Sequence, residues 1–399
     1  MNTSSAANFS SLLTQAVRTI AIQEDKLIAI VQDEIGHAIG REKGGSSIEY
    51  WRKGHIPANP DEVIKLAQEL VKRRGLDEEE CAHFLRSAGI LDSSQLISSL
   101  FRIQNQSEVS TAMIRELQPF VTGPPITEPR QFYGREKQVK RIFNWWYRYP
   151  LQSVALVGPK RSGKTSLLHY LRSVPYTPTS DLRPNQHNNW LLNPERYQWV
   201  VVDFQDYRMT TRSRLLAHIL DMLQAPVPDP CNLQNFMDVM IGQLQMPTII
   251  LMDEIGAALT STELDVHFWG SLRSLVSQYA AGNLAFLLTA HDIPNQMAIE
   301  QGKASPFFNI LNTVKVGPLT ESEARELVAS SPKAFAPEDV EWMVKQSQCW
   351  PALLQILCQT RLMALEEAET DEAWKEEGLQ RIDPFRYLLD GDSSAAQED

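Results

Sequence analysis

The sequence has few cysteines and no long apolar run. Its four cysteines form neither a C-x-x-C pair nor a Cys/His cluster with zinc-ligand spacing. We therefore expect a reducing compartment rather than a disulfide framework. The longest apolar runs, such as Thr248–Met252 and Leu284–Leu288, are far shorter than the roughly 20 residues that cross a bilayer. The N-terminus also lacks the charged-then-apolar order of a signal peptide. These absences predict a soluble, cytoplasmic protein without a membrane partner.

A surplus of positive charge is also missing. The 399 residues include 38 Lys and Arg against 49 Asp and Glu, which gives a formal net charge of −11. This balance excludes a protein that coats nucleic acid over its whole surface, although it leaves room for a local basic patch. The hydrophobic share of 43% and the charged share of 22% are ordinary for globular chains. The composition predicts a folded protein of several domains.

Strand-like segments occur only in the middle of the chain. Four short apolar runs alternate there with helical stretches: Ser153–Val157, Trp199–Phe204, Thr248–Met252 and Asn283–Thr289. Strands separated by helices predict an α/β fold with a parallel, doubly wound sheet. The flanking segments have helical patterns. We predict an all-α domain over 1–103, a Gly- and Pro-rich linker over 104–130, the α/β domain over 131–318, a helical segment over 319–385 and an acidic tail over 386–399.

The first predicted strand leads into a phosphate-binding pattern. Residues 158–165 read G-x-x-x-x-G-K-T and precede a helical stretch. Glycines allow successive backbone N–H groups to turn inward, and the start of the following helix favours negative charge. Lys164 can reach the β- and γ-phosphates, and the Thr165 hydroxyl can bind Mg²⁺. We predict nucleotide contacts from the whole loop: Gly158, Pro159, Lys160, Arg161, Ser162, Gly163, Lys164, Thr165 and Ser166.

Polar residues end two further strands. The run Thr248–Met252 is followed by Asp253 and Glu254, which has the form of a Walker B strand. We predict that Asp253 holds Mg²⁺ and that Glu254 deprotonates the attacking water. Another strand ends at Thr289, which we predict to lie near the γ-phosphate and the attacking water, with a strand cap as the alternative. The catalytic candidates are therefore Glu254, Lys164 and Thr289, and the metal ligands are Thr165 and Asp253.

Together these residues resemble AAA+ and STAND P-loop ATPases, near the bacterial relatives of origin-recognition and transposition-regulator ATPases. The box Phe132–Glu136 resembles the one that opens these domains, and the stretch Val316–Ala324 resembles the start of their helical lid. The resemblance implies that Gly134 and Arg135 approach the nucleotide and that Pro351 lies over it. The family usually carries glycine two places before this proline, where this chain has Cys349. STAND proteins often have Thr-x-Arg at the third strand, where this chain has His291.

The N-terminal region 26–75 resembles a repressor-type helix-turn-helix. Helices are expected over Lys26–Ile39, Ser46–Lys53 and Asp61–Arg74, and the second of these would read duplex DNA. The side chains expected to face a groove or to touch phosphates are Arg41, Lys43, Ser46, Ser47, Glu49, Tyr50, Arg52 and Lys53. However, residues 1–120 contain 13 Lys and Arg against 16 Asp and Glu, so a protein-interaction module and simple helical packing remain alternatives.

Two functions are consistent with these patterns. The first is an ATP- and Mg²⁺-dependent switch or assembly ATPase, a homo-oligomer whose nucleotide state controls its engagement of DNA or a partner. The second is a signalling or defence adaptor whose N-terminal module binds a protein. ATP is preferred over GTP on the resemblance, and the guanine-reading Asn-Lys-x-Asp motif is absent from the sequence. The aromatic run Trp145–Tyr147 is expected to pack on the sheet, with base stacking as the alternative.

Overall fold

The computed structural model describes residues 3–24, 26–41, 44–90, 117–368 and 371–390. The chain divides into two compact units, unit 1 over Met1–Leu117 and unit 2 over Gln118–Asp399. The predicted linker residues 104–116 and the predicted tail residues 391–399 lie outside the described residues, as does Lys43. Within the described ranges, no helix combines the length and the apolar character that a membrane span requires.

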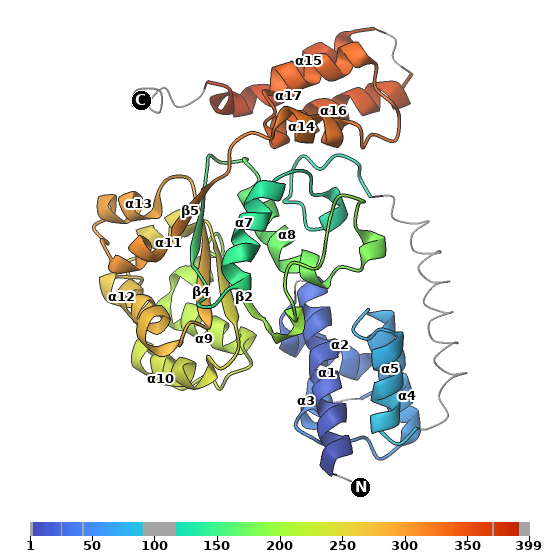
Figure 1. Cartoon of the computed structure of the whole chain (residues 1–399), viewed down its shortest axis with the longest axis vertical. Coiled ribbons are helices and arrows are strands. Elements are labelled where there is room, and N and C mark those ends of the chain that lie inside the picture. The colour runs from blue at the N-terminus through green and yellow to red at the C-terminus, as the bar shows by residue number, and fades with distance from the viewer. Residues whose placement is uncertain (1–2, 25, 42–43, 91–116, 369–370, 391–399) are drawn as a thin grey trace. The chain divides into compact units, whose positions relative to one another are not determined.

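Unit 1 is helical in its described part (Figure 1). Its helices are α1 (Thr3–Gln23), α2 (Ile28–Ala38), α3 (Gly44–Arg52), α4 (Pro60–Lys72) and α5 (Glu78–Ser87). Asn59 caps α4 by accepting a hydrogen bond from the Asp61 N–H, and Asp77 with Glu80 forms a capping box that starts α5. The three predicted helices correspond to α2, α3 and α4 with boundaries shifted by up to two residues.

A single apolar cluster holds these helices together. Phe9 of α1 stacks on Phe84 of α5 with ring centroids 4.5 Å apart, and Trp51 of α3 and Leu66 of α4 are buried in the same cluster. Side chains that recur every three or four residues supply this core, as the periodicity of α4 shows with Val63, Leu66, Ala67, Leu70 and Val71.

Unit 2 contains a parallel five-stranded sheet, which confirms the predicted α/β fold. The strands are β1 (Val154–Val157), β2 (Gln198–Asp203), β3 (Thr248–Asp253), β4 (Leu284–Ala290) and β5 (Asn312–Lys315), in the spatial order β2-β3-β4-β1-β5. All four pairings are parallel. The first four strands match the predicted runs closely. Strand β5 was not predicted, because only Val314 of its four residues is buried and the others are polar.

Helices cover both faces of this sheet. Alternate strand residues such as Val202, Met252 and Phe286 pack with buried side chains of α9 (Arg212–Met222), α10 (Leu233–Gln243), α11 (Ile255–Thr260), α12 (Val266–Ser274) and α13 (Pro294–Glu300). The opposite face meets α7 (Glu136–Tyr147), where Trp146 contacts Trp199 edge-on at 5.6 Å. Trp146 is thus fully buried, as the packing interpretation of Trp145–Tyr147 predicts, whereas Tyr147 is exposed.

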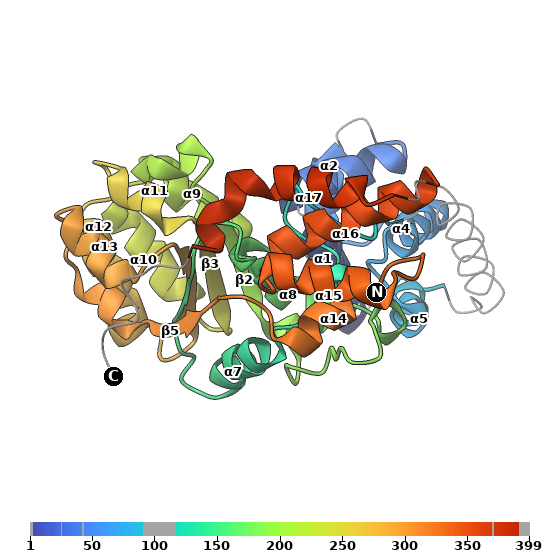
Figure 2. The ribbon, with the colours of Figure 1, turned by 90° about the horizontal axis from the view of Figure 1, so that it is seen from above.

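A group of helices follows the sheet (Figures 1 and 2). It consists of α14 (Glu321–Val328), α15 (Pro337–Ser347), α16 (Pro351–Glu366), α17 (Ala373–Ile382) and the short η8 (Asp383–Leu388). We call α14–α17 and η8 the lid. Its core contains Leu354, Leu357 and Trp374, together with Phe120 from the start of unit 2. Strand β5, which pairs with β1, connects to the lid through residues 316–320. The lid therefore begins close to the strand that leads into the phosphate loop.

Because the strands are parallel and β4 lies between β3 and β1, the carboxyl ends of these three strands meet at one edge of the sheet. Ligands of open α/β sheets bind outside such carboxyl ends. The predicted loop after β1 leads from this edge into α8 (Lys164–Ser173), and Asp253 and Thr289 stand on β3 and β4 at the same edge.

Candidate nucleotide-binding site

The loop between β1 and α8 has the backbone of an anion cradle. Gly163 has a φ of 92° and Arg161 a φ of 67°, so the chain turns through left-handed conformations before the helix starts. Gly158 lies so close to the next strand connection that a Cβ there would approach the Val316 carbonyl oxygen to 2.3 Å. No side chain caps the N-terminus of α8. Its first N–H groups therefore have no acceptor in the helix and remain available to a ligand's oxygens.

Two side chains add polar atoms to this cradle. The Lys164 ammonium donates to the carbonyl oxygens of Gly158 and Pro159 at 2.8 and 2.9 Å. Burial lowers the pKa of Lys164, while the charges of Glu254 and Asp253 oppose that shift. The Ser162 hydroxyl is buried and has no hydrogen-bond partner among the described residues. An unpaired buried hydroxyl is costly, so this atom marks a place where a ligand oxygen would be accommodated.

The buried Asp253 carboxylate joins the start of α8 and the ends of β3 and β4 into one network. The Thr165 hydroxyl at the start of α8 donates to Asp253 Oδ2 at 2.8 Å, and the Thr289 hydroxyl at the end of β4 donates to Oδ1. In turn, the Glu254 N–H donates to Thr289 Oγ1 at 2.8 Å. The structure therefore brings together Thr165, Asp253, Glu254 and Thr289, all of which the sequence singled out.

Glu254 follows β3 in a left-handed conformation, with φ and ψ both 54°. A non-glycine residue in this region costs free energy that the surrounding structure must offset. Here the hydrogen bond from the Glu254 N–H to Thr289 fixes the turn. The half-buried Glu254 side chain lies near enough to Lys164 for its charge to oppose the lowering of the Lys164 pKa by burial. The contacts make Thr289 a positioning residue for Asp253 and Glu254. Its predicted contact with the attacking water stays a prediction.

The predicted nucleotide box bridges the loop and the lid. Gly134 and Arg135 both have positive φ, at 70° and 64°. The Arg135 guanidinium donates to the Ser162 and Pro318 carbonyls at 3.1 Å each and also to the Gly317 carbonyl. Burial lowers the pKa of Arg135 to about 10, opposed by the nearby Glu323 carboxylate. Arg135 therefore ties the phosphate loop to the first lid residues, and a direct contact with nucleotide stays a prediction.

The lid proline, Pro351, lies at the phosphate loop, and its predicted place over the nucleotide stays a prediction. A Cβ on Gly163 would be 3.9 Å from Pro351 Cγ, so the start of α16 stands directly over the end of the loop. The turn before it places Gln348 and Cys349 in left-handed conformations, with φ of 45° and 61°. Cys349 stands where the ATPases that the sequence resembles carry glycine, and it places a side chain in a backbone conformation that favours glycine.

Several residues of this site had not been predicted. The Arg161 guanidinium lies 5.3 Å from the Phe385 ring of η8 and donates to the Gly123 carbonyl at 2.9 Å. The Tyr387 hydroxyl donates to the Lys160 carbonyl at 3.4 Å. These contacts join segments far apart in the sequence, so no local pattern reveals them. Asp203 could have been found, because it ends β2 beside Asp253 in the sheet register, and burial raises its pKa.

The residues present fit a magnesium-bound nucleoside triphosphate. The uncapped helix start, the Ser162 hydroxyl and the Lys164 ammonium are suited to phosphate oxygens. The Thr165 hydroxyl and the Asp253 carboxylate are oxygen donors of the kind that Mg²⁺ prefers. Their mutual hydrogen bond places these two oxygens 2.8 Å apart, within the first coordination sphere or a single water of one cation.

The basic residues predicted to touch DNA in unit 1 are engaged by neighbouring groups. Arg41 pairs with Glu62 at 2.5 Å and lies over the Trp51 ring, and Lys53 pairs with Glu49. Arg52, expected to face a groove, is half-buried and donates to the Thr14 hydroxyl of α1 at 3.3 Å. Burial lowers its pKa to about 10. Of the remaining predicted contacts, Ser46, Glu49 and Tyr50 are exposed and Ser47 is half-buried.

No protein-family model matches the chain, and no curated protein matches it significantly. Among solved structures, the Walker-type ATPase PABY2304 of Pyrococcus abyssi is 17% identical over 66% of this chain and 79% of that one, with a TM-score of 0.43. The ADP form of the Aeropyrum pernix ORC2 protein is 13% identical over 65% and 70%, with a TM-score of 0.43. The Aeropyrum pernix ORC1 protein in complex with DNA is 11% identical over 64% and 67%, with a TM-score of 0.41. Similarities this distant carry no argument about function.

The network around Asp253 yields a stability prediction. Thr289→Val keeps the shape of the side chain but removes the hydroxyl that donates to Asp253 Oδ1 and accepts from the Glu254 N–H, while Asp253 Oδ2 keeps its bond from Thr165. We expect a loss of about 1–3 kcal/mol in the free energy of unfolding of unit 2. Urea denaturation followed by tryptophan fluorescence measures it, since every tryptophan except Trp51 lies in unit 2.

Two matched variants control for the loss of the hydroxyl. Thr289→Ser keeps the donor and should be closer to wild type than Thr289→Val. Thr313→Val, at an exposed position of β5, should leave the midpoint unchanged. An unfolding midpoint of Thr289→Val equal to that of wild type would show that the Thr289 hydroxyl does not hold the network together.

Proposed function

We propose that the chain binds ATP with Mg²⁺ at this edge of the sheet, hydrolyses it, and uses the nucleotide state to control its association with other molecules. The observation that supports this most strongly is the placement of Lys164, Thr165 and Asp253 around one uncapped helix start. A loop of this kind next to an acidic strand end serves phosphate binding and transfer in P-loop proteins.

Each residue has a definite task in this proposal. The loop N–H groups and Lys164 hold the phosphate oxygens and oppose the negative charge that builds up during transfer. Thr165 and Asp253 would hold Mg²⁺, which would neutralise part of the phosphate charge. Glu254 accepts a proton as water forms a bond to the γ-phosphorus, while the bond to the β–γ bridging oxygen breaks and ADP leaves with that electron pair. Thr289 holds the Asp253 carboxylate and the Glu254 backbone in position through its two hydrogen bonds.

The lid contacts provide a route from nucleotide to association. The loop residues Lys160 and Arg161 contact η8, and Arg135 holds the loop to the lid's first residues. Phosphates that bind the loop would attract the Arg161 guanidinium away from the Phe385 ring and the Gly123 carbonyl, so the nucleotide-bound and nucleotide-free states would differ in lid contacts. We propose that this difference exposes or hides a surface for self-association, and that ATP rather than GTP is the physiological nucleotide.

The pairing of cations in unit 1 favours a second candidate function, that of an adaptor that recruits a protein. Phosphates near α3 would have to displace Glu49 from Lys53 and Glu62 from Arg41. An exposed Tyr50 stacked on His55, with ring centroids 3.7 Å apart, offers an aromatic surface more suited to a protein partner. Binding of duplex DNA through Ser46–Lys53 stays a prediction that competes with this one.

Two substitutions separate binding from hydrolysis. Lys164→Ala should abolish measurable ATP binding and turnover, because it removes the cation that reaches the phosphates. Glu254→Gln should keep ATP affinity within a few-fold of wild type while turnover falls about 10²- to 10⁴-fold, the contribution typical of general base catalysis. Calorimetric titration and a phosphate-release assay measure the two quantities, with Lys345→Ala on the exposed face of α15 as the matched lysine control. Wild-type turnover in Glu254→Gln would reduce the proposal to nucleotide binding alone.

The association proposal is tested by the size of the protein in solution. Size-exclusion chromatography with light scattering compares the chain without nucleotide, with ADP and with a non-hydrolysable ATP analogue, each with and without duplex DNA. A larger species with the analogue alone supports self-association and the adaptor function. A larger species only when DNA is present supports the DNA-linked function. An unchanged mass under all conditions contradicts a nucleotide-controlled assembly.

A further inference from the structure

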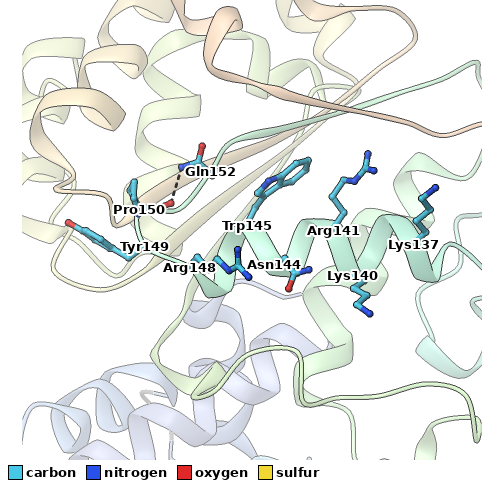
Figure 3. Close-up of a pocket in the computed structure, with 9 residues that line it drawn as sticks. All are labelled: Lys137, Lys140, Arg141, Asn144, Trp145, Arg148, Tyr149, Pro150 and Gln152. Atoms are coloured by element: carbon cyan, nitrogen blue, oxygen red, sulfur yellow. Dashed lines mark hydrogen bonds between the residues drawn. The ribbon is translucent and has the colours of Figure 1, made fainter.

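Helix α7 borders a basic hollow on the surface of unit 2 (Figure 3). The hollow has a volume of about 560 Å³ and lies apart from the residues of the phosphate loop. Its lining includes four cationic side chains and two aromatic ones: Lys137, Lys140, Arg141, Arg148, Trp145 and Tyr149. Asn144 and Gln152 add amide groups, and no carboxylate lines it. On a chain with a net charge of −11, this concentration of positive charge is unusual.

The four cations are exposed and take part in no ion pair with the described residues. Some cations elsewhere in the unit are paired: Arg325 on α14, for example, pairs with both Glu321 and Glu341. Four neighbouring cations without counter-ions repel one another and raise the local potential. An anionic ligand would relieve that repulsion.

The spacing of these residues follows one side of the helix. At about 100° per residue, positions 137, 140, 141, 144, 145 and 148 fall within an arc of roughly 140°. From Lys137 to Arg148 the row is about 16 Å long, which spans several phosphates at the ~3.4 Å per nucleotide of a strand. Figure 3 shows Lys137, Arg141 and Trp145 projecting from α7 in one direction and Lys140 in another. A strand of regularly spaced charges matches this row better than a compact anion does.

The two aromatic side chains are not needed for the core. Trp146 already packs α7 against the sheet through Phe143 and Trp199, so the half-buried Trp145 makes its own contact with the hollow. Tyr149 is 71% exposed, and its hydroxyl donates to the Ala281 carbonyl, which holds the ring in place. An aromatic ring fixed among cations offers a face on which a base can stack.

We propose that this α7 hollow binds a single-stranded nucleic acid, with phosphates on the four cations and a base stacked on Trp145. The regular charge row and the available aromatic face together favour this ligand over an acidic peptide, which has no use for a stacking surface. The site is separate from the nucleotide-binding site, so it can be lost without affecting ATP binding.

Fluorescence anisotropy with a labelled oligo(dT) of about 15 nucleotides tests the proposal on the full chain. Arg141→Glu with Arg148→Glu should weaken binding at least tenfold at low salt and reduce the slope of log K against log salt by about 1.4, since each lost phosphate contact contributes ~0.7 for single strands. The matched control reverses two exposed cations elsewhere in unit 2, Arg214→Glu with Lys345→Glu, and should bind nearly as wild type does.

Trp145→Ala should weaken oligonucleotide binding about 5- to 150-fold, and Trp145→Tyr should restore most of it. The urea unfolding midpoint measured on the same samples shows that the variants are folded and keeps this result independent of the proposed ATPase. An equal loss of oligonucleotide affinity in the hollow pair (Arg141→Glu with Arg148→Glu) and the control pair would overturn the proposal. A Trp145→Ala variant that binds like wild type would also overturn it. Binding to duplex alone, or displacement of the oligonucleotide by polyglutamate at equal concentration, would also overturn it.

Discussion

The rest of the site depends on the hydrogen bonds that the buried carboxylate of Asp253 accepts. This carboxylate accepts one hydrogen bond from the Thr165 hydroxyl at the start of α8 and another from the Thr289 hydroxyl at the end of β4. The Thr289 oxygen in turn accepts a hydrogen bond from the Glu254 N–H. An ionised carboxylate is tolerated in a buried position only when such donors surround it. The same donors therefore define the distance between the loop and the acidic strand end, which sets the geometry for a metal and a phosphate.

Around this carboxylate the fold connects the phosphate loop to the lid. Arg135 binds carbonyls of both the loop and the first lid residues, Pro351 lies over Gly163, and η8 contacts Arg161. These contacts border the phosphate loop, so they offer the proposed nucleotide switch a physical route to the lid. The basic hollow along α7 lies outside this network and provides a second surface whose charge the overall acidic composition conceals.

Much of the sheet and of the site was predictable, because both depend on local patterns. Four strands are apolar runs, and Lys164 and Asp253 belong to motifs whose spacing reflects phosphate geometry. Strand β5 was missed because its polar residues pair through the backbone alone. Arg52 was expected to face a groove, but α1 lies against it, a contact that only the tertiary packing of unit 1 determines. The contact of Phe385 with the loop has the same origin.

The most direct test of the account is the effect of Mg²⁺ on ATP affinity, measured by calorimetric titration of wild type and of Asp253→Asn with Mg²⁺ and with excess EDTA. If Asp253 helps to hold the metal, Mg²⁺ should tighten ATP binding to wild type, and the substitution should remove most of that gain while leaving the metal-free affinity similar. An equal gain from Mg²⁺ in both proteins would contradict the central role given to this carboxylate.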